Sequence, residues 1–182
     1  MSMVVYDSLS GNKRPFETLE EGKVKMYVCG VTPYSDCHLG HARCYVAWDL
    51  VYRYLMYAGY EVTYVRNFTD VDDKIIKRAN DLGIDPMDLA EQNIQSFYRD
   101  MDALGIARPQ HEPRVSTSID AIVGIVKQLE ENGLAYNVDG DVFFEVDRFD
   151  DYGKLSKRNL DDMRAGARVD VDSRKRNPMD FA

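Results

Sequence analysis

The sequence predicts an α/β protein with parallel strands, and three features of its first half support this prediction. The apolar run at residues 24–29 stops at Gly30 and is long enough for a buried strand. Residues 42–58 have the periodicity of a helix, and the alternating segment 61–66 is typical of a second strand. Strand, helix and strand in this order form a βαβ unit with a right-handed crossover. The loop after the first strand then opens at the carboxyl edge of the sheet, where α/β folds bind ligands.

Three more helices are predicted from their caps and their apolar periodicity. One covers residues 72–82, the next begins after Asp85 with a proline at its first position, and the last covers residues 118–132. Each helix has an apolar stripe that we expect to face inward. The stripes are Val46, Ala47, Leu50, Val51, Tyr54, Leu55 and Ala58 in the first helix, Met87, Ala90, Ile94, Phe97, Met101 and Leu104 in the third, and Ile119, Ile122, Val123, Val126 and Leu129 in the fourth.

The last third of the chain contains a predicted β-hairpin. Asp139 and Gly140 separate two β-type segments, 135–138 and 141–146, and this dipeptide is the strongest short-range signal for a two-residue turn. After the hairpin the chain is charged and rich in turns. Because the chain stops on apolar residues and provides few strands for its sheet, we expect it to be part of a larger domain.

Composition and charge narrow the class of protein. The 182 residues carry a net charge of −8 and have a pI of about 4.9. This balance argues against nonspecific binding to nucleic acid, which depends on Lys and Arg, but not against a local patch. Cys29, Cys37 and Cys44 form neither a disulfide framework nor a CxxC pair, which favours a reducing compartment. Without a signal peptide or an apolar run of membrane-spanning length, we expect a cytoplasmic protein with no membrane partner.

The richest group of reactive side chains follows the first predicted strand, in the sequence VCGVTPYSDCHLGHARCY. His38 and His41 flank Leu39 and Gly40 where this loop meets the helix. The first turn of a helix has unpaired N–H groups and a partial positive charge, so it stabilises an anion placed there. Imidazoles added to that end suit a phosphate undergoing displacement, and Gly40 lets a flat ring approach the backbone. The alternative is that the two histidines only cap the helix.

The sequence HLGH resembles the HIGH motif of class I aminoacyl-tRNA synthetases, with leucine in place of isoleucine. Its surroundings make the resemblance more specific. MYVCG precedes it, HARCYVAWD follows it, and VRNFTDVDDKIIKRAN comes next, as in cysteinyl-tRNA synthetases. The similarity continues through EPRVSTSI, GDVFFEV, YGKLSKR, AGARVDV and KRNPMDF, and so covers nearly the whole chain.

This resemblance implies roles for particular residues. Cys29 matches a thiolate ligand of a zinc ion that binds the sulfur of the substrate cysteine; the family's other ligands, a cysteine, a histidine and a glutamate, would lie beyond the chain. Zinc takes a thiolate readily, so it can separate cysteine from serine without an editing site. His38 and His41 would be catalytic and bind the phosphates of ATP, and Gly40 would contact its adenosine. Gly30 and Thr69 would line the cysteine pocket.

Some of these residues have structural alternatives. Cys29 could be a buried strand cysteine that behaves as a small apolar residue. Thr69 could cap the helix that begins near Asp72. Asp70, Asp72 and Asp73 form an acidic cluster that resembles a metal site, but stabilising the positive end of that helix explains them better.

The resemblance also implies an activity and a domain plan. The parent enzyme would activate L-cysteine with ATP and magnesium to cysteinyl-adenylate, then transfer the cysteinyl group to tRNA(Cys). Residues 1–107 would form the first half of a Rossmann-like catalytic domain, and residues 108–182 a connective insertion with a helix and a hairpin. Such a fragment should be inactive alone and bind zinc poorly. The alternatives are the cysteine ligase of mycothiol biosynthesis and a non-catalytic nucleotide-binding fragment.

One segment resembles a second motif of the class. Lys154, Leu155, Ser156 and Lys157 are similar to the KMSKS loop that works with the HIGH motif. They lie too early in the chain, before the second half of the nucleotide-binding fold. We therefore predict an ordinary surface turn there.

Overall fold

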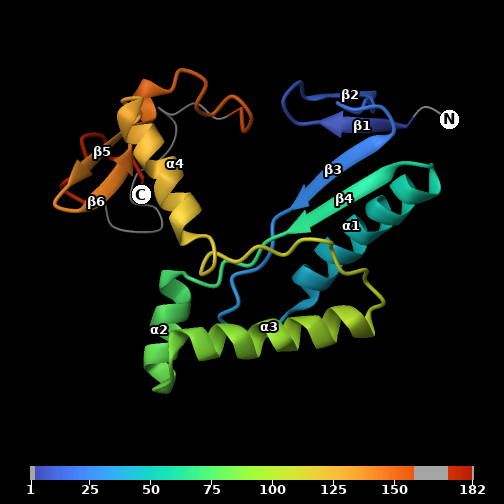
Figure 1. Ribbon diagram of the computed structural model, residues 1–182, viewed down its shortest axis with the longest axis horizontal. Helices are drawn as coiled ribbons and strands as arrows, with labels where there is room; N and C mark the ends of the chain where they lie inside the picture. Colours follow the sequence, from blue (N-terminus) through green and yellow to red (C-terminus); the bar gives the residue numbers. More distant parts are fainter. Residues whose placement is uncertain (1–2, 158–171, 182) are drawn as a thin grey trace. The chain divides into compact units, whose positions relative to one another are not determined.

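The structure is a computed structural model that describes residues 3–157 and 172–181 (Figure 1). It divides into two compact units, which are described separately. One is Thr18–Ile119, and the other combines Met1–Glu17 with Asp120–Ala182. The AGARVDV segment of the sequence resemblance lies outside the described residues.

The unit Thr18–Ile119 is built on two parallel strands. Strand β3 (Lys23–Val28) pairs in parallel with β4 (Glu61–Arg66), and helix α1 (Leu39–Tyr57) connects them (Figure 1). Alternate side chains of both strands are buried: Val24, Met26 and Val28 from β3, and Val62, Tyr64 and Arg66 from β4. The prediction of an α/β fold with a strand–helix–strand unit is confirmed.

A third extended segment runs beside β4. The N–H of Arg66 donates to the carbonyl of His111 at 3.0 Å, and the N–H of Phe68 donates to that of Pro113 at 2.9 Å. Farther along, the buried carboxylate of Asp70 accepts hydrogen bonds from both the backbone N–H and the hydroxyl of Ser116. The explanation of Asp70 as a helix-end charge is therefore wrong, because its carboxylate fixes this neighbouring segment.

Helices α2 (Asp73–Leu82) and α3 (Pro86–Ala103) begin where predicted, and α2 also ends where predicted. Asp72 caps α2 through the N–H of Lys74, and Asp85 caps α3 through the N–H groups of Met87 and Asp88. Gly83 ends α2 with φ of 66°, a left-handed conformation that glycine adopts without strain. Most of the predicted stripe of α3 is buried, namely Ala90, Ile94, Phe97 and Met101, whereas Met87 and Leu104 are exposed.

The buried face of α1 differs from the prediction. The helix begins at Leu39, three residues before the expected start, and buries Tyr45, Tyr52 and Leu55. Most of the predicted stripe is exposed: Val46, Ala47, Leu50, Val51, Tyr54 and Ala58. Apolar side chains occur nearly all round this helix, so its periodicity did not identify the side on which Tyr52 packs against Tyr64 of β4, with ring centroids 5.2 Å apart.

The other unit contains two hairpins. Strands β5 (Ala135–Val138) and β6 (Asp141–Phe144) pair in antiparallel fashion around Asp139 and Gly140, whose φ values are 53° and 96°. Positive φ at both positions is the signature of a type I′ turn, so the predicted hairpin is confirmed. A second hairpin, formed by β1 (Val4–Asp7) and β2 (Asn12–Pro15), was not predicted, and its residues are nearly all exposed.

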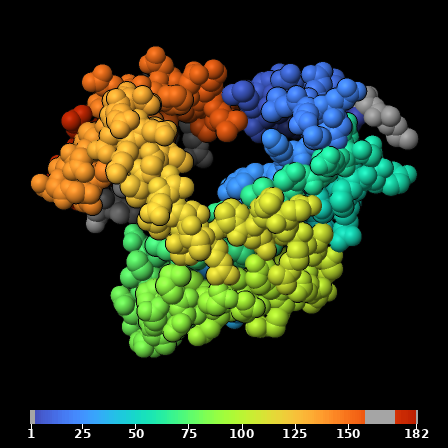
Figure 2. All heavy atoms as spheres, viewed as in Figure 1, coloured from blue at the N-terminus to red at the C-terminus, as the bar shows by residue number. Residues whose placement is uncertain are grey.

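Helix α4 (Ile119–Glu131) forms where predicted, but none of its residues is buried. Figure 2 shows its side chains at the surface in this view. Ile119, Ile122 and Val123 are exposed, so the expected inward stripe is not buried in the described part of the chain. In the same unit, buried Asp180 accepts hydrogen bonds from the Tyr136 hydroxyl and from the N–H of Val146, which begins a short 3₁₀ helix (Val146–Arg148).

The predictions for residues 154–157 and for membrane-spanning segments can be compared with the structure. Lys154 to Lys157 lie in a turn and are exposed, and the Lys154 ammonium pairs with Asp151 at 3.1 Å. None of the helices within residues 3–157 and 172–181 has the length and apolar character that crossing a bilayer requires.

Candidate active site at the end of strand β3

The six residues singled out by the sequence all lie in the unit Thr18–Ile119, around the carboxyl end of β3 and the start of α1. They are Cys29, Gly30, His38, Gly40, His41 and Thr69. The ends of β3 and β4 supply Cys29, Gly30 and Thr69, and the first turn of α1 supplies the two histidines and Gly40.

Asn67, which the sequence analysis did not identify, connects the two strand ends. Its side-chain oxygen accepts hydrogen bonds from the Gly30 N–H at 2.8 Å and from the Tyr27 hydroxyl at 2.9 Å. Its amide nitrogen lies 3.4 Å from the Thr69 hydroxyl, and the Thr69 N–H donates to the carbonyl of Val31 at 3.0 Å. Gly30 and Thr69 are therefore held close together through Asn67.

Two of the structural alternatives are wrong. Thr69 does not cap α2, because Asp72 does so. Cys29 is not a buried strand residue, because it is exposed one position beyond the end of β3. Gly30, in turn, is required by packing: a Cβ there would lie 1.4 Å from the carbonyl oxygen of Asn67.

His38 and His41 cap α1 reciprocally. Nδ1 of His38 accepts from the N–H of Gly40 at 3.1 Å, and Nδ1 of His41 accepts from the N–H of His38 at 3.3 Å. The two rings stack with centroids 3.9 Å apart and an angle of 19° between their planes. A Cβ at Gly40 would lie 2.8 Å from Cε1 of His38, so a larger residue would disturb this stack.

Because Nδ1 of each histidine accepts a capping hydrogen bond, the protonation of Nε2 on the other side of the ring is determined. A neutral imidazole whose Nδ1 accepts a hydrogen bond carries its proton on Nε2. Partial burial, and then the neighbouring His38, lower the pKa of His41, which favours this neutral form. The two histidines therefore do cap the helix, as the alternative stated, but the caps use only Nδ1 of each ring. It leaves an Nε2–H donor on each ring at the positive end of the helix.

Cys29 offers a thiol at the edge of the sheet, a donor type that zinc accepts readily. Within residues 3–157 and 172–181, no group of three or more His, Cys, Asp or Glu residues could hold a metal ion by itself. A zinc ion bound through Cys29 would therefore need donors from outside these residues. Cys37 is a poor alternative, because burial, and then Asp100 and Asp36, raise its thiol pKa to about 11.

Helix α3 supports the loop that joins β3 to α1. The side-chain amide of Asn93 donates to the carbonyl of Pro33 at 3.1 Å, and the hydroxyl of Ser96 donates to the Asp36 carboxylate at 2.7 Å. Both contacts join residues sixty positions apart in sequence. Helix α3 thus holds the loop that precedes His38 at Pro33 and at Asp36.

The parallel strands and the two histidines at the start of α1 fit the class I aminoacyl-tRNA synthetases that the sequence resembles. Comparison with known proteins supports the same class. The family model described as tRNA synthetases class I (C) catalytic domain matches residues 15–182. The chain therefore belongs to the family of class I (C) tRNA synthetase catalytic domains.

Its relatives at the sequence level are cysteine--tRNA ligases. The chain is 57% identical over its whole length to the cysteine--tRNA ligase of Trichlorobacter lovleyi, and covers 37% of that protein. It is 56% identical over its whole length to the cysteine--tRNA ligase of Geobacter sulfurreducens, and covers 38% of that protein. The chain thus spans well under half the length of these relatives.

Solved structures of other synthetases share the fold. In the ternary complex of Agrobacterium radiobacter K84 agnB2 LeuRS with tRNA and LeuAMS, the matching chain is 26% identical with a TM-score of 0.56. The match covers 65% of this chain and 16% of that one. Mycobacterium tuberculosis methionyl-tRNA synthetase in complex with methionyl-adenylate matches with a TM-score of 0.57 at 24% identity, covering 62% of this chain and 23% of that one. The second similarity shows the fold alone.

Proposed function

We propose that this chain is the ATP- and cysteine-binding part of a cysteine--tRNA ligase. The carboxylate of cysteine would attack the α-phosphorus of ATP, with magnesium bound to the nucleotide. Cysteinyl-adenylate forms as pyrophosphate leaves, and the cysteinyl group then passes to a ribose hydroxyl of the 3′-terminal adenosine of tRNA(Cys), which releases AMP. The single observation that carries the proposal is the capped start of α1, where two Nε2–H donors lie at the helix terminus that follows the Cys29–Gly30 loop.

In this proposal His38 and His41 act on the phosphates. Displacement moves negative charge onto the leaving pyrophosphate, and donors that are already oriented stabilise that charge without reorganising. The Nδ1 caps supply the orientation, because they prevent either ring from turning. Gly40 presents backbone without a side chain beside them, where the adenosine would lie.

Cys29, Gly30 and Thr69 would form the amino-acid pocket. Zinc, when bound with Cys29 as one donor, supplies a thiophilic contact for the sulfur of the substrate. Gly30 and Thr69 border the pocket with backbone and hydroxyl groups that Asn67 holds in place. Because zinc binds a thiolate much more readily than a hydroxyl, the pocket would select cysteine over serine at the binding step.

The domain plan and location follow the same proposal. Residues 1–107 would form the first half of the catalytic domain and residues 108–182 the connective insertion, in a cytoplasmic enzyme. The relatives' greater length supports the view that the chain alone lacks part of the active site.

The test is cysteine-dependent ATP–pyrophosphate exchange, measured on a protein of full family length that carries this sequence. We expect exchange with cysteine, none with serine, and loss of exchange when Cys29→Ser is introduced. Offering tRNA and, separately, an amino sugar as acceptor then distinguishes the tRNA ligase from a mycothiol-type ligase. Nucleotide binding without exchange would show that the protein is a binder only and would refute the proposal.

A further inference from the structure

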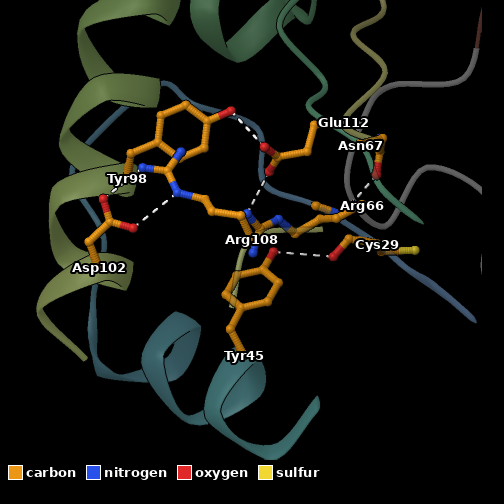
Figure 3. Close-up of polar contacts among 9 residues, drawn as sticks. Cys29, Tyr45, Arg66, Asn67, Tyr98, Asp102, Arg108 and Glu112 are labelled. Carbon is orange, nitrogen blue, oxygen red and sulfur yellow. Dashed lines mark hydrogen bonds and ion pairs between the residues drawn. The ribbon is translucent and has the colours of Figure 1, made fainter. Parts of the chain in front are cut away.

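Tyr45 of α1 contacts the backbone of Cys29 directly. Its hydroxyl donates a hydrogen bond to the Cys29 carbonyl at 3.1 Å (Figure 3). The Tyr45 side chain is 2% exposed, whereas Cys29 is exposed. A buried helix residue therefore holds the main chain at the position of the exposed Cys29 thiol.

The same peptide unit is held from its other side. The N–H that follows the Cys29 carbonyl belongs to Gly30, and it donates to the Asn67 side chain at 2.8 Å. A peptide group is planar, so fixing both its carbonyl and its N–H fixes its orientation. Tyr45 and Asn67, which come from α1 and from the end of β4, together immobilise the peptide between Cys29 and Gly30.

Tyr45 is itself held by a buried arginine. The guanidinium carbon of Arg66 lies 5.1 Å from the centroid of the Tyr45 ring and 4.7 Å from that of Phe97. The Tyr45 and Phe97 rings meet edge to face at 5.4 Å and 89°. Cation–π and edge-to-face contacts of this kind favour a defined ring position.

Arg66 is in turn fixed by Glu112. Its Nη2 donates to the Glu112 carboxylate at 2.6 Å, and the other oxygen of that carboxylate accepts from the Tyr98 hydroxyl at 2.9 Å (Figure 3). Nε and Nη1 of Arg66 are buried and have no hydrogen-bond partner among the described residues. The Tyr45 and Phe97 rings provide the guanidinium with cation–π contacts in place of further hydrogen bonds. Because the Glu112 carboxylate holds the guanidinium in place, Arg66 in turn supports the Tyr45 ring.

We propose that Tyr45 is a positioning residue for the amino-acid pocket. Its hydroxyl orients the Cys29–Gly30 peptide, and thereby sets the direction of the Cys29 thiol and of the Gly30 backbone toward substrate cysteine. This inference rests on the proposed role of Cys29 as a metal-binding thiolate. It assigns Tyr45 to cysteine binding and not to the phosphate site.

The test compares Tyr45→Phe with Tyr52→Phe in the full-length, zinc-loaded protein. Tyr45→Phe removes only the hydroxyl and keeps the ring over Arg66. Tyr52 is the matched control, because it is also a buried tyrosine of α1 with one hydroxyl contact, a hydrogen bond of 3.0 Å from the Gln110 side chain. The kinetic readout is KM for cysteine and for ATP in the exchange assay.

A second readout does not depend on activity. After zinc is removed with a chelator, Cys29 alkylation by iodoacetamide is followed by peptide mass spectrometry, with exposed Cys44 as internal reference. We expect Tyr45→Phe to raise KM for cysteine about threefold to tenfold, because the loss of one hydrogen bond weakens binding by about that factor. KM for ATP should stay within about twofold, and the ratio of Cys29 to Cys44 alkylation should change at least about twofold. Tyr52→Phe should change none of these values.

Either of two results would overturn the inference: unchanged KM for cysteine and unchanged alkylation in Tyr45→Phe, or equal effects of Tyr45→Phe and Tyr52→Phe. Cys29→Ser separates this failure from failure of the proposed function. If Cys29→Ser abolishes exchange while Tyr45→Phe does nothing, only the positioning role is wrong. If Cys29→Ser leaves cysteine binding unchanged, the proposed role of Cys29 is wrong as well.

Discussion

Replacing Gly30 with alanine should separate the ends of the two parallel strands. The added Cβ would lie 1.4 Å from the Asn67 carbonyl oxygen and 2.6 Å from its carbonyl carbon, both backbone atoms that cannot turn away. The strand ends must therefore move apart by more than about 1 Å. That movement breaks the Gly30–Asn67 hydrogen bond and strains the packing around it.

The expected cost can be worked from these two contributions. Overpacking of this kind costs about 1–3 kcal/mol, and the lost hydrogen bond adds about 1 kcal/mol. We expect Gly30→Ala to lower the free energy of unfolding by about 3 kcal/mol, measured by urea denaturation followed by circular dichroism. Gly124→Ala is the control: it lies in α4 with open space around it, so it should be neutral or stabilise by up to about 1 kcal/mol. A loss below about 0.5 kcal/mol for Gly30→Ala would show that the close contact with the Asn67 carbonyl does not constrain the strand ends.

Three other perturbations follow from the same contacts. Ser116→Ala removes a donor from buried Asp70, so it should cost about 1–3 kcal/mol of unfolding free energy in the same urea assay. Lys154→Ala changes an exposed turn, so pyrophosphate exchange by the full-length protein should fall less than about tenfold, and a far larger loss would mean that this turn is catalytic. Burial lowers the pKa of His41, so protonation favours the unfolded chain; stability is present above the unfolded value of about 6.5 and is lost below it. The melting temperature should therefore fall more steeply between about pH 7.5 and 5.5 in the wild type than in His41→Asn.

Elements with local signals could be predicted from the sequence. Asp72 and Asp85 mark the starts of α2 and α3, and Asp139 with Gly140 marks the hairpin turn, because caps and tight turns depend on a few adjacent residues. The hairpin β1–β2 was missed because its residues are exposed and give no clear alternation of apolar and polar side chains.

Features that depend on distant residues could not be predicted. The buried side of α1 is decided by which side chains meet β4, and Leu50, although apolar, is 70% exposed. Asn67, Tyr45 and Arg66 were not identified, because their contacts with Gly30, Cys29 and Glu112 join segments at least sixteen positions apart. A lone arginine in an alternating strand carries no local signal that its side chain will be buried, with only 1% of its surface exposed.

His41→Asn isolates the proposed contribution of His41, whose Nε2 would stabilise phosphate charge at the start of α1. The asparagine oxygen can take over the cap that Nδ1 now provides to the His38 N–H, but it cannot reach the position of Nε2. In the full-length protein, the single-turnover rate of cysteinyl-adenylate formation should fall about a hundredfold to a thousandfold, with ATP affinity and melting temperature little changed. A rate within about threefold of the wild type, with the cap intact, would show that His41 only caps the helix and does not stabilise phosphate charge.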